Sequence, residues 1–202
     1  MTISLLLALI GFAAVSSITP GPNNLMLMAS GANFGLRRTV PHMLGISLGH
    51  MFMVFLVGIG LGQLLETYPV LNWIMLILST AYLLYLTWKI ANAAPPEARE
   101  ATGRPFTFLQ AAAFQWVNPK AWYMAIYAIT NYVPDGSGWR GALLVAGVFA
   151  MTNLPSITIW ATLGTQVKRL LGRPGLLRAF NWTMAGLLVL TLIPVWYQAM
   201  IY

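Results

Sequence analysis

Six long apolar stretches, joined by short polar connections, decide what this chain can fold into. They are residues 3–32, 40–65, 70–90, 106–133, 141–166 and 179–201. Each is long enough to cross the hydrocarbon core of a bilayer as a helix, which takes about 20 residues. Of the 202 residues, 58% are hydrophobic and 7% are charged, which is more apolar surface than a water-soluble domain can bury. We therefore expect residues 1–202 to form one all-α, polytopic membrane domain.

The first and the fourth stretch are too long for one straight helix, and both are interrupted near the middle. The interruptions are Thr19-Pro20-Gly21-Pro22-Asn23 and Asn118-Pro119-Lys120. Proline lacks an amide hydrogen and clashes with the preceding turn, so each interruption should end one helix and start another. Pro22 and Pro119 suit the first position of the new helices, with Gly21 and Asn118 as their caps.

A helix that starts inside a membrane offers free amide groups and the positive end of its dipole. Both suit a carboxylate or another anion. We expect the two starts to face each other, with Lys120 in the first turn of the second one. A lysine this deep in an apolar stretch usually faces an interior cavity, which makes Lys120 the leading candidate for binding an anion. Alternatively, the breaks are packing kinks and Lys120 extends along its stem to a membrane surface.

The basic residues indicate which way the chain crosses the membrane. Nine of the 11 lysines and arginines fall on one side, at Arg37, Arg38, Lys89, Arg99, Arg104, Lys168, Arg169, Arg173 and Arg178. The connections on the other side hold only Arg140. Cytoplasmic loops are enriched in lysine and arginine, so the nine mark the cytoplasm and both termini should be periplasmic. This rule explains the net charge of +7 better than a nucleic-acid partner does.

The longest polar connection, residues 93–105, divides the chain into two halves, 1–92 and 106–202. Each half holds three stretches, so the second begins on the opposite side of the membrane and the halves are inverted in topology. Many secondary transporters have this design, with broken helices around a site near the midplane. The two interruptions occupy the first stretch of each half. The sequence therefore predicts six transmembrane helices in an inverted 3+3 repeat, with the first and fourth broken.

Other polar residues within the stretches are candidates for an interior site. Gln115, Asn153 and Asn181 are candidates for interior polar contacts. His42 and His50 are more typical of hydrogen-bonded packing residues than of metal ligands, because no carboxylate or thiol accompanies them. His50, near the middle of its stretch, is also a candidate proton carrier.

Two glycines in the second stretch predict close packing between helices. Gly45 and Gly49 are four residues apart and match the small-xxx-small pattern of membrane helix contacts. Glycine-rich helix faces of this kind are also compatible with packing between two copies of the chain in a homodimer.

Some residue types are absent from the apolar stretches, and their absence excludes several kinds of chemistry. The chain has no cysteine, so disulfides, thiolate metal sites and thiol catalysis are excluded. The four acidic residues, all in connections, are Glu66, Glu97, Glu100 and Asp135. No carboxylate is therefore expected in the membrane to carry a proton, bind sodium or pair with an amine. We expect no metal and no cofactor.

The motifs around the interruptions resemble those of the LysE/RhtB family of bacterial amino-acid exporters. They are Thr19 to Asn24, then Gly31-Ala32-Asn33-Phe34-Gly35-Leu36-Arg37-Arg38-Thr39, then Pro41 and Gly45, and later Asn118-Pro119-Lys120-Ala121-Trp122. The resemblance covers nearly the whole chain in length, topology and motif order. It implies an inner-membrane exporter of amino acids or their derivatives, driven by the proton gradient.

The family's motif carries over onto two groups of residues as the implied substrate site. These are Pro20, Gly21, Pro22, Asn23 and Asn24, and Asn118, Pro119 and Lys120. An amino acid's carboxylate would suit the two helix starts and Lys120. Its ammonium would meet freed carbonyls near Thr19, Asn23 or Asn24.

Two other classes of function stay open from the residues alone. A metal or small-ion exporter on a related six-helix plan would want clustered histidine, cysteine or carboxylate side chains. A membrane enzyme or lipid-handling protein would need a nucleophile, a base or a metal set at the membrane face. The sequence favours a secondary exporter of small amino acids, without enzymatic activity, that works among membrane lipids.

Overall fold

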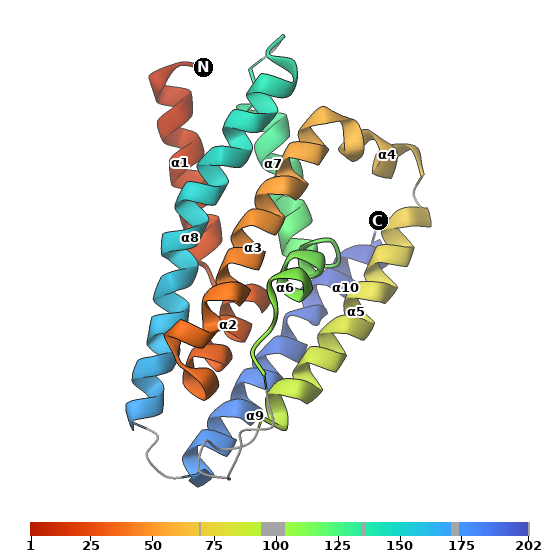
Figure 1. Cartoon of the computed structure of the whole chain (residues 1–202). Coiled ribbons are helices and arrows are strands. Elements are labelled where there is room, and N and C mark those ends of the chain that lie inside the picture. Colours follow the sequence, from red (N-terminus) through yellow and green to blue (C-terminus); the bar gives the residue numbers. More distant parts are fainter. Residues whose placement is uncertain (69, 94–103, 135, 171–173, 202) are drawn as a thin grey trace.

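The computed structural model describes residues 1–202 except 69, 94–103, 135, 171–173 and 202, and every regular element in the described part is a helix (Figure 1). The helices are α1 (Ile3–Ile18), α2 (Pro22–Phe34), α3 (Leu36–Leu56) with a π-helical continuation (Val57–Leu61), α4 (Gly62–Thr67), α5 (Val70–Ala91), α6 (Phe108–Gln115), α7 (Pro119–Tyr132), α8 (Gly138–Leu170), α9 (Pro174–Leu190) and α10 (Leu192–Ile201). The expected all-α membrane architecture is confirmed.

Both predicted interruptions are real breaks in the helices. Helix α1 ends at Ile18 and α2 begins at Pro22, at an angle of 55°. Helix α6 ends at Gln115 and α7 begins at Pro119. Because a proline disfavours the α conformation in the residue before it, the residues that precede Pro20, Pro22 and Pro119 are all extended.

Helix length in the structure gives fewer membrane crossings than the six that the sequence pattern predicts. Among the described residues, four helical segments are long and apolar enough to span a bilayer, and the bent pair α1 and α2 makes a fifth. The predicted fourth stretch is divided into α6, with 8 residues, and α7, with 14. The count of six transmembrane helices therefore stays a prediction.

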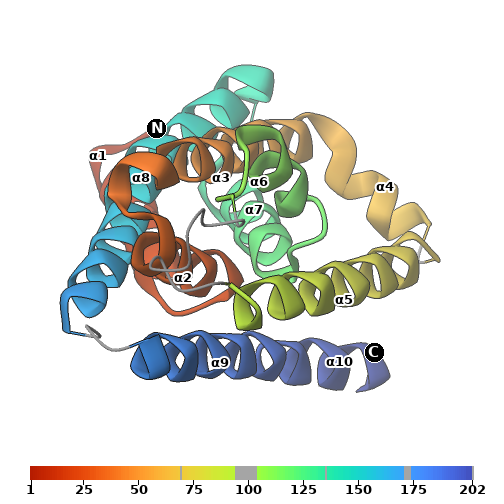
Figure 2. The same cartoon turned by 60° about the horizontal axis from the view of Figure 1, so that its bottom comes forward.

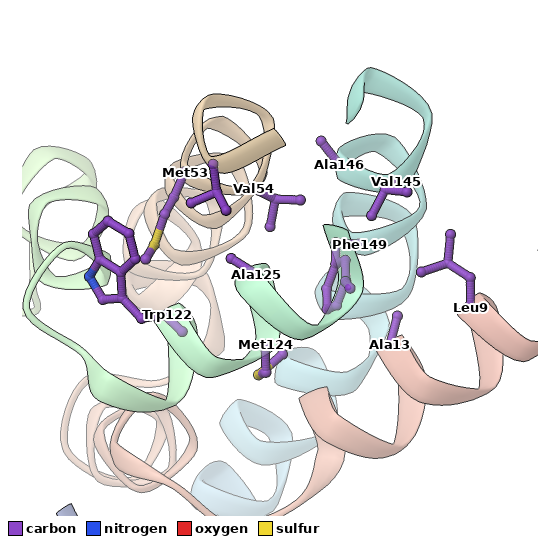
Figure 3. Close-up of a cluster of buried hydrophobic side chains, with 13 residues drawn as sticks. Leu9, Ala13, Met53, Val54, Trp122, Met124, Ala125, Val145, Ala146 and Phe149 are labelled. Atoms are coloured by element: carbon purple, nitrogen blue, oxygen red, sulfur yellow. The ribbon is translucent and has the colours of Figure 1, made fainter. Parts of the chain in front are cut away.

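Helix α8 is the central packing element. It contacts α1, α2 and α3, while α6 packs against α3 and α5 lies beside α9 (Figures 1 and 2). A buried apolar cluster joins α1, α3, α7 and α8 through side chains that include Leu9, Met53, Trp122 and Phe149 (Figure 3). The outward surface carries many exposed large apolar side chains, as expected of helices that face lipid.

Glycines allow the closest of these helix contacts. A β-carbon on Gly45 or Gly49 would collide with α6, which confirms the packing predicted from their spacing. A β-carbon on Gly31 of α2 would collide with the backbone of α8, and one on Gly164 of α8 with the backbone of α2. The Gly45 and Gly49 face is thus used inside the chain, and the homodimer stays a prediction without support from this face.

The segments that carry the basic connections meet at one end of the molecule. The start of α3, the end of α5 and the start of α9 lie at the bottom of Figure 1, and the N-terminus and the turn between α7 and α8 lie at the top. Which end faces the cytoplasm stays a prediction. Glu66 falls within the short helix α4, whereas Glu97, Glu100, Asp135, Arg99 and Arg173 lie outside the described residues.

Candidate functional site

The two breaks meet at one small cavity in the interior of the helix assembly. Its volume is about 20 Å³, which is room for about one ordered water molecule. The lining residues are Ser16, Ser17, Gly21, Asn23, Asn24, His50, Gln115, Asn118, Lys120, Ala121, Met124, Asn153 and Ile157. An amino acid would fit only if the surrounding helices moved apart.

The carbonyl groups at the end of α1 already accept hydrogen bonds. Asn24 Nδ2 donates to the carbonyl oxygens of Ser17 and Thr19, both at 2.8 Å. Trp160 Nε1 donates to the carbonyl oxygen of Ile18 at 2.9 Å. These three carbonyl groups are therefore not free in this structure, and a substrate ammonium would have to replace one of their present donors.

The start of α2 is not closed by a side-chain cap. Gly21 offers no side-chain acceptor, and no side-chain cap bonds to the first turn of α2. The first turn holds the backbone amides of Asn23 and Asn24, at the positive end of the helix dipole. This helix start can receive a carboxylate.

The start of α7 is already closed by its own cap. The side-chain oxygen of Asn118 accepts from the backbone N–H of Lys120 at 3.2 Å. The carbonyl oxygen of Asn118 accepts from the N–H groups of Ala121 and Trp122. Asn118 is therefore the cap that its sequence position indicated, and it uses the amide of Lys120 that an anion at this helix start would have needed.

The Lys120 side chain crosses from α7 to the first break. Its Nζ donates to the carbonyl oxygen of Thr19 at 2.8 Å, to Thr19 Oγ1 at 2.9 Å and to the carbonyl oxygen of Pro20 at 3.4 Å. These acceptors lie at the negative end of the α1 dipole. The ammonium thus binds the opposite break, while the alternative in which it extends to a membrane surface stays a prediction.

Gly21 leaves the space that Lys120 occupies. A β-carbon on Gly21 would lie 2.9 Å from Lys120 Cδ and 3.2 Å from Nζ, closer than ordinary contact. The glycine therefore provides room for the flexible end of the lysine, which would have to shift if a β-carbon were present, and it is not needed for an unusual backbone conformation, since its φ of −177° is extended.

A pair of amide side chains joins the two breaks a second time. Asn23 Nδ2 donates to Gln115 Oε1 at 2.9 Å, and Gln115 Nε2 donates to Asn23 Oδ1 at 3.2 Å. Gln115 also donates to the carbonyl oxygen of Ala111. The end of α6 is thereby fixed to the start of α2.

Two other lining residues carry polar atoms without a partner. His50 is 3% exposed and stands edge-on to Phe149, and neither ring nitrogen has a hydrogen-bond partner among the described residues. Asn153 is 5% exposed and donates to Ser17 Oγ at 3.3 Å, while its Oδ1 has no described partner. His42 likewise packs against Phe106, and its ring nitrogens have no hydrogen-bond partner among the described residues.

The structure brings most of the predicted site residues to this cavity. Eight of them line it, namely Gly21, Asn23, Asn24, His50, Gln115, Asn118, Lys120 and Asn153. Thr19 and Pro20 contact Lys120 instead, and Pro22 and Pro119 start the two helices. The sequence interpretation missed Ser16, Ser17, Met124 and Ile157, although the two serines directly precede the first break.

A second cavity, of about 240 Å³, lies between α2 and the end of α5. Its lining includes Lys89, Arg104 and Phe106 but none of the predicted site residues. Asn181, one of the interior candidates, is fully buried and exchanges hydrogen bonds with Asn33, which lines this second cavity. Asn181 is therefore not part of the central cavity.

Comparison with known proteins places the chain in a family. Residues 14–193 match the model of the family described as LysE type translocator. The chain belongs to this family. This LysE type translocator is 31% identical over 198 residues to a cysteine/O-acetylserine efflux protein of Klebsiella pneumoniae, covering 94% of this chain and 95% of the relative.

Further relatives carry the same description. The translocator is 29% identical over 202 residues to the cysteine/O-acetylserine efflux protein of Escherichia coli K12, covering 98% of this chain and all of the relative. The protein of that description from Shigella sonnei is equally similar. No solved structure matches the chain. The family resemblance drawn from the motifs is thus confirmed.

Proposed function

We propose that this LysE type translocator exports small amino acids or amino-acid derivatives from the cytoplasm across the bacterial inner membrane. Relatives described as cysteine/O-acetylserine efflux proteins align with almost its whole length, which supports this function over those of an enzyme or a metal exporter. Among the described residues, no group of three or more potential ligands could hold a metal ion. Secondary transport of this kind uses an ion gradient and needs no cofactor.

The observation that carries the proposal is the meeting of both broken helices at one cavity, with the Lys120 ammonium between them. In the proposed complex, the substrate carboxylate lies at the open start of α2, bound by backbone amides and by Lys120. The substrate ammonium takes an acceptor that Lys120 releases at Thr19. The lysine thus moves from the end of α1 to the carboxylate when the substrate binds.

We also propose that the chain has six transmembrane helices in two inverted halves, with α6 and α7 together forming the fourth and both termini periplasmic. The packing supports this symmetry. Helix α1 contacts α8 and α6 contacts α3, which are equivalent pairs if the halves are exchanged. A cavity of about 20 Å³ would then open to each side in turn as the halves move.

Proton coupling is part of the same proposal. His50 and Lys120 are the ionisable side chains that line the central cavity in the described part of the chain. A histidine can exchange a proton within the physiological range, and we propose His50 as the proton carrier. Export that continues unchanged after a protonophore collapses the gradient would refute this part alone.

The test is efflux from proteoliposomes that contain the purified chain and are loaded with radiolabelled cysteine, O-acetylserine or serine. Efflux of at least one of them above that of protein-free liposomes is expected, and it should rise when a proton gradient is imposed. A panel of amino acids and divalent cations run in parallel identifies the transported class. Transport of cations alone would overturn the proposal.

A further inference from the structure

The deep wall of the central cavity holds two polar groups that the proposed carboxylate and ammonium contacts do not use. They are the imidazole of His50, on α3, and the amide of Asn153, on α8. The start of α2 and Lys120 already provide for the groups that all amino acids share. The deep wall is therefore available for what differs among amino acids, the side chain.

These two groups are fixed in place and yet incompletely bonded. The His50 ring packs edge-on against Phe149, with centroids 5.2 Å apart, and Asn153 lies one helical turn after Phe149 on α8. The Asn153 Nδ2 is used by Ser17 Oγ, which leaves its Oδ1 as the unpaired atom. Buried polar atoms are nearly always paired in proteins, so three atoms that lack a partner among the described residues, on two side chains that line one cavity, indicate a ligand or water that pairs with them.

The rest of the wall limits the size and polarity of what can bind there. Met124 and Ile157 line the same cavity, so their side chains contribute apolar surface beside the two polar groups and border the space that a substrate side chain enters. The neutral imidazole offers one donor and one acceptor, and the Asn153 oxygen offers an acceptor. This combination fits a short, uncharged side chain that ends in a hydroxyl, a thiol or a carbonyl group.

We propose that His50 and Asn153 determine the side-chain specificity of the transporter by hydrogen bonding to a small polar group on the substrate. This inference rests on the proposed export of amino acids. The two residues reject an apolar side chain of the same size because it would leave their buried polar atoms unpaired. A proton-carrying role of His50 is compatible, since the neutral ring makes the contact.

The decisive measurement compares two substrates of equal shape. Serine and 2-aminobutyrate differ only in a hydroxyl against a methyl group, and the ratio of their initial efflux rates from proteoliposomes reports specificity independently of total activity. We expect the unmodified chain to favour serine about tenfold. Asn153→Leu and His50→Phe should each bring this ratio close to one.

Two further variants separate this role from a structural one. His50→Gln keeps donor and acceptor groups but cannot carry a proton at neutral pH, so it should retain the preference for serine. His42→Phe replaces a buried histidine that also lacks a described partner but does not line the cavity, and it should leave the ratio unchanged. An equal ratio in Asn153→Leu and the unmodified chain, or an equal loss in His42→Phe, would overturn the inference. If the unmodified chain exports no amino acid at all, the proposed function fails instead.

Discussion

The two helix breaks look alike in the sequence but differ in the structure. Each consists of a proline at the first position of a new helix, preceded by a residue that can cap it. At α7 the cap is an asparagine, whose side chain closes the helix start. At α2 the cap is Gly21, which leaves the first turn open and makes space for Lys120 from the other break.

This difference teaches that the site is asymmetric. The break of the second half supplies a cation, and the break of the first half supplies the surface to which that cation binds. In the proposed complex, a carboxylate therefore has one helix start to bind rather than two.

Removing the cation should have the largest effect. Lys120→Ala deletes three hydrogen bonds to the first break and the only lysine or arginine that lines the cavity in the described residues. Hydrogen bonds to charged groups contribute about 1.5–3 kcal/mol, so export should fall by about 100-fold. Efflux from proteoliposomes measures this, with matched protein content. Lys89→Ala, at the second cavity, serves as the control and should stay within about twofold. Unchanged export in Lys120→Ala would remove the lysine from the mechanism.

Straightening the first break should have the next largest effect. Pro20→Ala combined with Pro22→Ala restores two amide donors and allows α1 to continue toward α2, which reduces the bend of 55°. We expect export to fall by about tenfold, because the open helix start is lost. Pro41→Ala, inside α3, is the matched control. Normal efflux from vesicles with the double variant would show that the break is structural only.

Filling the space at Gly21 should have a smaller effect. In Gly21→Ala the new β-carbon would lie 2.9 Å from Lys120 Cδ, so the lysine side chain must shift away from Thr19. Export should fall by about fivefold, because charge-assisted contacts depend on geometry. Gly11→Ala, in α1, is the control, since a β-carbon there meets nothing within 4 Å. If both variants export equally well, the close approach at Gly21 has no functional role.

Removing the cap of α7 should have the smallest effect on transport. Asn118→Ala costs about 1 kcal/mol of stability through the lost cap, but Lys120 keeps its contacts with the first break. Faster amide exchange in the first turn of α7 and a lower melting temperature in detergent would show the loss, whereas export should fall by about twofold at most. Asn118→Ser retains a capping oxygen and should behave like the unmodified chain. A large loss of export in Asn118→Ala would mean that the α7 start binds substrate after all.

The breaks could be predicted from the sequence because the stereochemistry of proline is local. Pro22 and Pro119 are the first residues of α2 and α7, as their positions in the sequence indicated. The spacing of Gly45 and Gly49 likewise predicted a close contact between helices. Apolar length likewise predicted a membrane protein, although the division into α6 and α7 leaves the crossing count to be tested.

The hydrogen-bond partners could not be predicted, because they join residues far apart in the chain. Lys120 bonds to a residue 101 positions earlier, and Trp160 donates to a carbonyl 142 positions earlier. No local pattern indicates that the end of α1 is satisfied by these donors. The surroundings of His50 could not be predicted either, because they depend on the side chains of α8. Phe149 of α8 packs against the ring, and no described residue bonds to its nitrogens.

The Lys120 contact also has an electrical consequence. In the described part of the chain, Lys120 is the only lysine or arginine that lines the central cavity, and in the proposed cycle it returns to its starting position. A zwitterionic amino acid adds no net charge when it crosses. With the proposed proton coupling, the current measured across a bilayer during export therefore counts the coupling ions alone, and the membrane potential at which that current reverses gives their number per amino acid.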